Sequence, residues 1–406
     1  METPQEFRLP ICEVTEVSGS GFEMGFARGQ RHRWQLTRAL RRYADIAFSA
    51  GQTLLAKRRE YSDCELENCF GAEITDELHG LAAGSGLSLT DLVRHNLSVF
   101  PIHATGLSGC VQFAGCASDG TFVHGANLDV TFTRIVPDAL EPALIVRRPT
   151  GKIPSLSLVP TGLVGSRGGL NAAGVLVSTC DLLDDAFADS PDVGLRRGAL
   201  MSLILDNADS YESACSMAKE LAATGAKAIA LTDMATGRVT LSENYGRTVV
   251  QRAMPTLIQA NHSLLLAQEL GGSQTGGLEE ERGIPAHSRH RYRRLKELLV
   301  IDDSGRFTWD SGTISSVLRD DYDPETTAGR STCVSNLFRT MNMILRLDNV
   351  WSWLYRACDN TFLVCPTGTP WRSETRRSVW STLSLTEILP EWQPAVKAFG
   401  EERSHA

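Results

Sequence analysis

The spacing of apolar and polar residues changes about a quarter of the way along the chain. Apolar positions recur with helical spacing over residues 20–60 and 74–81. Ser88 and Asp91 have the spacing of a capping box before an apolar run that includes Leu92 and Leu97. The first hundred residues are therefore predicted to be mostly α-helical.

Beyond Gly106 the pattern favours strands separated by turn residues, with helical stretches between them. Predicted strands cover 121–124, 143–146, 155–159 and 174–178. Predicted helices cover 195–206, 210–221 and 291–300. Two predicted hairpins join 228–232 to 239–243 and 333–347 to 350–355. Helices follow helices and strands follow strands, so the two kinds of element do not alternate strictly. This order predicts a layered α+β fold, a sheet sandwich with helices outside.

Composition supports a globular chain and argues against several partners. Of 406 residues, 42% are hydrophobic and 22% charged, and the net charge is −8. The densest basic run, 288–294, is short, so we expect no nucleic-acid partner. The first residues lack a signal-peptide pattern, and no apolar run approaches the roughly 18–20 residues of a membrane span. We expect a cytoplasmic protein with no membrane partner.

Metal and nucleotide motifs are absent from the sequence. The ten cysteines include no Cys-x-x-Cys pair. His287 and His290 lack the spacing of a helical zinc pair, and the acidic run 320–323 lacks the glycine and terminal glutamate of a calcium loop. The glycines of 165–169 match no phosphate-binding fingerprint. We expect no metal and no bound cofactor.

Residues 108–130 hold the highest concentration of side chains that could take part in a reaction. Asp119-Gly120 is a strong hairpin signal, so a strand that starts at Cys110 turns there and returns to Asn127 and Asp129. Such a hairpin brings the Asp129 carboxylate back beside the Cys110 thiol. A nucleophile and a charged group then share one end of a sheet.

This stretch resembles the N-terminal-nucleophile (Ntn) hydrolases of the acyl-coenzyme A:6-aminopenicillanic acid acyltransferase family, which are related to acid ceramidase, bile salt hydrolase and penicillin V acylase. Residues 125–129 (Gly-Ala-Asn-Leu-Asp) match the family's Gly-x-Asn-x-Asp element, 19 residues separating Cys110 from Asp129. Further matches, in the family's order, are residues 20–29, 77–84, 162–178 and 259–262. The resemblance covers most of the chain.

The resemblance implies an αββα four-layer sandwich and autocatalytic cleavage of the Gly109–Cys110 bond. Residues 1–109 would form a helical pro-segment, and 110–406 the catalytic domain, with the two chains staying associated. The new α-amine titrates near 7.7–8.0, which suits a general base for the thiol of the same residue. Cys110 would accept an acyl group as a thioester and pass it to water or an amine. The implied substrates are small-molecule acyl-amides, or an amine with an acyl thioester, and acyl-coenzyme A is a candidate co-substrate.

Each remaining site residue has a functional and a structural interpretation. Asp129 would orient the new amine, and Asn127 is either a contact to that amine or a turn residue. Asn261 offers the side-chain N–H that an oxyanion hole needs, or it caps a loop. His262 is interpreted as structural. Cys116 is the rival nucleophile, because it also follows a glycine.

The sequence does not identify which residue supplies positive charge next to the nucleophile. Amidase relatives usually carry arginine where this chain has Ala126, which favours the penicillin-type branch. Arg291 is the preferred substitute, although Arg289 and Arg294 are alternatives, as is a helix with solvated arginines. Ala126 and the unassigned arginine also suggest a second hypothesis, a binding protein that kept the fold and lost its activity.

Overall fold

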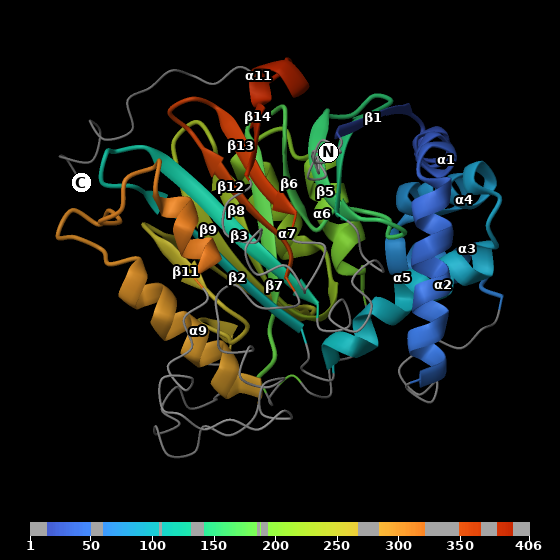
Figure 1. Ribbon diagram of the computed structural model, residues 1–406, viewed down its shortest axis with the longest axis horizontal. Helices are drawn as coiled ribbons and strands as arrows, with labels where there is room; N and C mark the ends of the chain where they lie inside the picture. Colours follow the sequence, from blue (N-terminus) through green and yellow to red (C-terminus); the bar gives the residue numbers. More distant parts are fainter. Residues whose placement is uncertain are drawn as a thin grey trace, which may run out of the picture.

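A computed structural model describes residues 14–49, 60–104, 108–130, 142–184, 187, 194–266, 284–320, 349–366 and 380–392. Two β-sheets lie face to face at its centre, and helices cover their outer faces (Figure 1). Within the described residues, one sheet has the strand order β1-β4-β5-β6-β7-β8-β9-β10 and the other β11-β2-β3-β12-β13-β14. We refer to them as the eight-stranded and six-stranded sheets.

The eight-stranded sheet is antiparallel except for its first pair, β1 and β4, which are parallel. Its strands are β1 (Val14–Gly19), β4 (Pro142–Pro149), β5 (Ser155–Pro160), β6 (Gly168–Asn171), β7 (Val175–Asp181), β8 (Ala223–Asp233), β9 (Val239–Gly246) and β10 (Thr248–Met254). The residues of β7 and most of those of β8 and β9 are buried. Consecutive residues along these strands are buried because both faces of this part of the sheet are covered.

The six-stranded sheet is antiparallel and contains the β2–β3 hairpin. Its strands are β2 (Ser108–Cys116), β3 (Phe122–Val130), β11 (Leu257–Gln259), β12 (Asn349–Arg356), β13 (Thr361–Pro366) and β14 (Ser381–Ser384). The largest hydrophobic cluster fills the space between the two sheets, where Leu144 and Leu176 of one meet Leu128 and Trp353 of the other. The hairpin therefore has one face on the central core.

Helices complete the outer layers. Helices α6 (Arg197–Asn207) and α7 (Tyr211–Glu220) pack on the eight-stranded sheet through a second apolar cluster. Helix α9 (Ile284–Leu298) and the 3₁₀ helix η4 (Ile314–Arg319) cover the six-stranded sheet through a third. A short helix, α11 (Leu385–Ile388), follows β14. The order helix, sheet, sheet, helix confirms the predicted αββα sandwich.

The N-terminal helices gather at one side of the sandwich (Figure 1). They are α1 (Gly21–Arg31), α2 (Arg33–Ser49), α3 (Asp63–Phe70), α4 (Ala72–Ser85) and α5 (Leu89–Ala104). The backbones of α1 and α4 lie so close that a Cβ on Gly25 would come within 2.0 Å of the Glu77 carbonyl oxygen. Because β1 also joins the eight-stranded sheet, this region is built into the sandwich.

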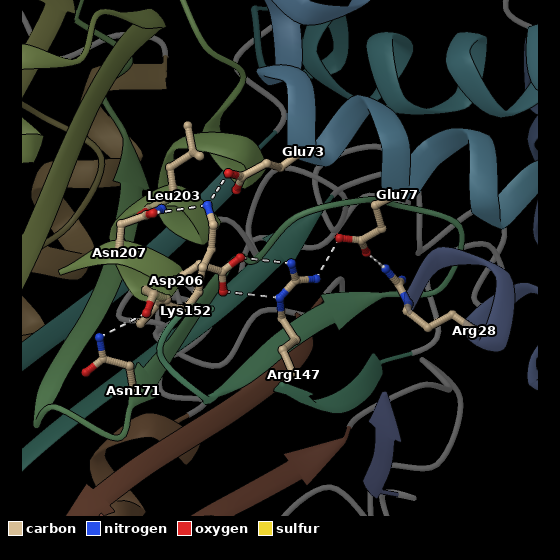
Figure 2. Close-up of polar contacts among 10 residues, drawn as sticks. Arg28, Glu73, Glu77, Arg147, Lys152, Asn171, Leu203, Asp206 and Asn207 are labelled. Atoms are coloured by element: carbon tan, nitrogen blue, oxygen red, sulfur yellow. Dashed lines mark hydrogen bonds and ion pairs between the residues drawn. The ribbon is translucent and has the colours of Figure 1, made fainter. Parts of the chain in front are cut away.

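A buried ion-pair network connects the N-terminal helices to the eight-stranded sheet and to helix α6, which covers that sheet (Figure 2). Glu77 on α4 accepts from Arg28 on α1 and from Arg147 on β4, the latter at 2.6 Å. Arg147 also binds Asp206 on α6 at 3.0 Å. Burial raises the pKa of Glu77, but Arg147 and Arg28 outweigh it, and the pKa is held below its ordinary value. Four charges far apart in the sequence thus compensate one another.

Most predicted elements are confirmed, with a few differences. The hairpin of 228–232 and 239–243 forms as β8 and β9, and the Ser88 side chain accepts from the Asp91 N–H at the start of α5. The predicted hairpin of 333–347 with 350–355 is only partly testable, because 333–347 lies outside the described residues. Strand β12 pairs instead with β13 and β3. Strand β13 follows β12 directly, whereas β3 precedes it by more than 200 positions, and local patterns do not encode that second pairing.

Candidate active site

The β2–β3 hairpin forms as the sequence predicts and fixes the register of the site. Gly120 has φ +80°, the left-handed conformation that its turn requires. Gly109 pairs with Asp129, and Cys110 pairs with Leu128. The nucleophile candidate and the carboxylate candidate are therefore one register step apart at the same end of the sheet.

Alternation along the strands sends neighbouring side chains to opposite faces. Cys110, Ala126 and Leu128 belong to the core between the sheets, and Cys110 has no exposed surface. Asn127 faces the outer layer, where its Nδ2 donates to the Leu318 carbonyl at 2.9 Å. Asp129, two residues further, is buried on that same face. The thiol and the carboxylate thus share one end of the hairpin, as expected, but alternation places them on opposite faces and not side by side.

Arg291 and Asn261 hold the backbone of Cys110 from two directions. The Cys110 N–H donates to Asn261 Oδ1 at 2.8 Å, and Arg291 Nη1 donates to the Cys110 carbonyl at 2.9 Å. Arg291 Nη2 donates to the same Asn261 oxygen at 2.7 Å. One guanidinium therefore bridges the backbone carbonyl of the candidate nucleophile and the side chain that binds its nitrogen.

Asn261 acts here as an acceptor toward Cys110, which differs from the expected oxyanion donor. Its Nδ2 donates to the Asp181 carbonyl at 2.8 Å, so the amide hydrogens point away from Cys110. Two donors at its oxygen and an acceptor at its nitrogen fix this orientation. The side chain of Asn261 connects the start of β2 to the end of β7.

The structure separates the three candidate arginines. Arg291 is buried with 1% exposure and contacts Cys110. Arg294 forms an ion pair with Asp320 at 2.9 Å and another with Glu297. Arg289 is partly exposed, and its charge acts on Asp184. Of the three, only Arg291 is placed against Cys110 by these contacts.

Two further groups that the sequence did not single out lie beside Cys110. Cys180, near the end of β7, is fully buried and belongs to the same apolar cluster between the sheets as Cys110. The next residue, Asp181, pairs with Lys227 at 2.7 Å and with Arg197 at 3.1 Å. No sequence signal marks them, because a cysteine in an apolar strand is indistinguishable from a core residue.

These neighbours change the ionisation of the Cys110 thiol. The neighbouring Cys180 thiol favours the Cys110 thiolate, burial opposes it, and Arg197 supports it against Asp181. The backbone N–H of Asp129 also contributes, and the pKa of Cys110 is lowered to about 7. Burial, with the neighbouring Cys110, raises the pKa of Cys180 above its ordinary value. One thiol of the pair is therefore readily ionised, whereas the other keeps its proton.

The remaining candidates occupy supporting positions. Asn127 lies within β3 and is not a turn residue, which corrects one of its two interpretations. Cys116 lies at the opposite end of β2 from Cys110 and pairs with Phe122. His262 Nδ1 contacts Ser288 Oγ at 2.8 Å, as expected of a structural histidine, and the same hydroxyl accepts from the Asn261 N–H.

The described residues contain neither a cluster that could hold a metal ion nor a membrane-spanning helix. No group of three or more His, Cys, Asp or Glu side chains in the described ranges is placed to hold a metal ion. No helix in the described part of the chain is long and apolar enough to cross a membrane. None of the cysteines in the described part of the chain forms a disulfide; they are Cys64, Cys69, Cys110, Cys116, Cys180, Cys215, Cys358 and Cys365.

Comparison with protein families gives the class of the protein. Residues 119–343, more than half of the 406, match the family model of acyl-coenzyme A:6-aminopenicillanic acid acyl-transferase. The chain belongs to this family, which implies acyl transfer or amide hydrolysis as the type of reaction. The match includes Asp129, Asn261 and Arg291, and it begins nine positions after Cys110.

Solved structures with a detectable likeness are distant. An ortholog of N-acylethanolamine-hydrolyzing acid amidase from Caenorhabditis elegans is 15% identical, covering 68% of this chain and 100% of its own, with a TM-score of 0.38. A mutant conjugated bile acid hydrolase from Clostridium perfringens is 9% identical, with 68% and 93% covered and a TM-score of 0.42. Penicillin V acylase from Agrobacterium tumefaciens is 14% identical, with 68% and 92% covered and a TM-score of 0.35. A search of curated proteins found no match.

Proposed function

We propose that the chain is a self-processing cysteine amidase or N-acyltransferase with Cys110 as its nucleophile. The observation that carries the proposal is the set of contacts at Cys110. Its nitrogen is held by Asn261, its carbonyl by Arg291, and its thiol has a pKa of about 7. A thiol that is half ionised near neutral pH, on a fixed backbone, is suited to attack a carbonyl carbon.

Self-processing uses this thiol first. The Cys110 sulfur attacks the Gly109 carbonyl carbon, the peptide nitrogen leaves with a proton, and a thioester joins Gly109 to the sulfur. Water then hydrolyses the thioester, leaving a carboxylate on Gly109 and a free amine on Cys110. Because Asn261 Oδ1 already accepts from this nitrogen, it is in place to hold the new amine. The Asp129 carboxylate stabilises the ammonium form and so makes the amine a better proton acceptor.

Turnover repeats the same chemistry on a substrate. The thiolate attacks the acyl carbon of an amide, the amine product leaves with a proton from the Cys110 ammonium, and an acyl thioester remains on the sulfur. Water or a second amine then displaces the thiol and takes the acyl group. An acyl thioester such as acyl-coenzyme A would load Cys110 equally well, releasing a thiol in place of an amine.

The buried network supports association of the two product chains. Arg28 and Glu77 belong to the proposed pro-segment, 1–109, whereas Arg147 and Asp206 belong to the proposed catalytic chain, 110–406. Strand β1 also remains paired with β4 across the cut. Cleavage at Gly109–Cys110 leaves these contacts intact, so we expect one folded particle made of two chains.

Intact mass under denaturing conditions tests the proposal directly. Freshly purified protein should give chains of 109 and 297 residues, which together account for the 406 of the sequence. Cys110→Ala should stay a single chain without turnover, while Cys116→Ala, the matched control on the same strand, should process and turn over normally. A panel of acyl-amides, with and without acyl-coenzyme A, then separates hydrolysis from transfer. A wild-type chain that stays uncut and inactive would support the non-catalytic binding protein instead.

A further inference from the structure

A buried carboxylate in the middle of β9 gathers hydrogen bonds from four consecutive residues. Glu243 has no exposed surface, and its Oε1 accepts from the Leu264 N–H at 2.7 Å. Its Oε2 accepts from the Ser263 hydroxyl at 2.6 Å and from the N–H groups of Leu265 and Leu266 at 3.0 and 2.8 Å. The proposed chemistry gives this carboxylate no role so far.

The segment held by this carboxylate begins two residues after Asn261. The Asn261 N–H donates to Ser288 Oγ at 2.7 Å, and its carbonyl accepts from the Leu183 N–H at 2.8 Å. The Ser263 N–H donates to Asp184 Oδ2 at 2.7 Å. This stretch of chain is therefore tied to α9 on one side and to the residues that follow β7 on the other.

The backbone position of Asn261 decides whether its short side chain reaches the candidate nucleophile. Its Oδ1 accepts from the Cys110 N–H at 2.8 Å and from Arg291 Nη2 at 2.7 Å. A displacement of about 1 Å is enough to take such contacts beyond hydrogen-bond distance. Whatever holds the chain next to Asn261 therefore also holds the contact with Cys110.

A carboxylate suits this position because all four groups that meet it are donors. An ionised carboxylate offers only acceptors, whereas the amide of a glutamine would turn an NH₂ toward some of these donors. Burying a charged group is costly unless hydrogen bonds compensate it. At Glu243 the compensation comes from residues 263–266, so the carboxylate and the segment stabilise one another.

We propose that Glu243 is a positioning residue, which holds residues 263–266 and thereby keeps Asn261 against the backbone of Cys110. This inference rests on the proposed function, because it assigns Glu243 a role in the reaction of Cys110. Glu243 acts through Asn261, and no bond to Glu243 forms or breaks during self-cleavage or turnover.

Hydrogen exchange in the uncut Cys110→Ala chain tests the positioning without any need for activity. The N–H of residue 110 donates to Asn261 Oδ1, so it should be protected in that background. Adding Glu243→Gln should make this N–H exchange about ten-fold faster or more, because the bond to Asn261 opens locally. Amide exchange followed by mass spectrometry with fragmentation measures it at residue 110.

A double-mutant cycle tests whether the same residue acts through Asn261 in catalysis. In processed protein, Glu243→Gln should lower kcat by about ten- to 100-fold with KM little changed, since a misplacement of about 1 Å costs up to about 100-fold. Asn261→Ala should cost about 100-fold. The double variant should be no slower than Asn261→Ala alone, whereas independent effects would multiply to about 1,000-fold or more.

Asp233→Asn is the matched control, because it also removes a carboxylate that holds a turn. Asp233 accepts from the Ala235 N–H at 3.0 Å and from the Thr236 hydroxyl at 2.6 Å. It pairs with Val175, at the opposite end of β7 from Asp181. Asp233→Asn should therefore leave both the exchange at residue 110 and kcat unchanged.

A milder variant covers the case in which Glu243→Gln does not fold. Ser263→Ala removes one of the four donors and should shift both readouts in the same direction by a smaller factor. Unchanged exchange at residue 110 in the folded variants, or losses of kcat that multiply in the double variant, would overturn the inference. The proposed function fails separately, when Asn261→Ala keeps the wild-type kcat or Cys110→Ala keeps its activity.

Discussion

Two clusters of buried arginine show different uses of the same side chain. Around Glu77, the guanidiniums of Arg28 and Arg147 bind carboxylates, and Arg147 also binds Asp206. Beside Cys110, Arg291 donates instead to two neutral oxygens, the Cys110 carbonyl and Asn261 Oδ1. The first arrangement pairs each charge with an opposite one. The second directs a positive charge at the backbone of a nucleophile.

The difference indicates what each cluster contributes. A fully paired buried network holds distant segments in one arrangement, and breaking it leaves an uncompensated buried charge. A guanidinium bound to neutral oxygens contributes less attraction in the resting protein and can stabilise negative charge that develops during a reaction. We therefore expect substitutions in the Glu77 cluster to lower stability, and substitutions at Arg291 to lower activity.

The largest expected effect is on stability. Glu77→Gln leaves Arg28 and Arg147 without their shared carboxylate, and we expect the free energy of unfolding to fall by about 3–5 kcal/mol. Urea denaturation of the uncut Cys110→Ala background measures it. Glu73→Gln, on the same helix, is the control: its pair with Lys152 is partly exposed, so the loss should stay below about 1 kcal/mol. Equal losses in the two variants would contradict the assignment.

A large effect on catalysis, with little change in unfolding, is expected at Arg291. Arg291→Lys keeps the charge but loses the planar fork that reaches two oxygens. The resulting misplacement of Cys110 should lower kcat by about 100-fold. Single-turnover kinetics on processed protein measure the loss, and urea denaturation checks the fold. Unchanged kcat in a folded Arg291→Lys protein would remove the contrast between the two clusters.

A smaller loss is expected at Asp129. Asp129→Asn keeps the size of the side chain and removes the negative charge of the residue that pairs with Gly109. We expect the new amine to become a weaker base by about one pKa unit, with self-cleavage or turnover about ten-fold slower and little change in folding. Time-resolved intact mass follows cleavage, and an amide hydrolysis assay follows turnover. Wild-type rates in correctly cleaved protein would exclude the assigned role.

The smallest effect is expected at Arg294, one turn of α9 away from Arg291. Its ion pairs with Asp320 and Glu297 are partly exposed to solvent. Arg294→Ala should cost less than about 1 kcal/mol of stability and leave kcat unchanged. Measured beside Arg291→Lys, it shows whether catalysis depends on one arginine or on the charge of the whole helix.

Local patterns were sufficient to predict much of the fold. Asp119-Gly120 predicts the β2–β3 turn, and the spacing of Cys110 and Asp129 around it fixes their shared end of the sheet. Alternation also places Asn127 and Asp129 on one face. These features depend on neighbours within one hairpin, where turn geometry sets the register.

Contacts between layers could not be predicted in this way. Arg291 and the Cys110 carbonyl are 181 positions apart, and Asn261 and Asp181 are 80 apart. The sequence offers three arginines in one short stretch, and only the docking of α9 against the sheet selects Arg291. The packing of β7 against β2 similarly brings Cys180 to Cys110, although neither strand carries a signal for the other.

The sequence by itself determined the family, the layered α+β class, the hairpin and the candidate nucleophile, because these depend on short-range spacing and turn chemistry. The tertiary structure decided which arginine meets Cys110, which way the amide of Asn261 points, and that a second thiol lies beside the first. These outcomes depend on burial and on charges brought together by the packing of the two sheets. Electrostatic effects grow where water is excluded, and a linear pattern of residues does not specify where that happens.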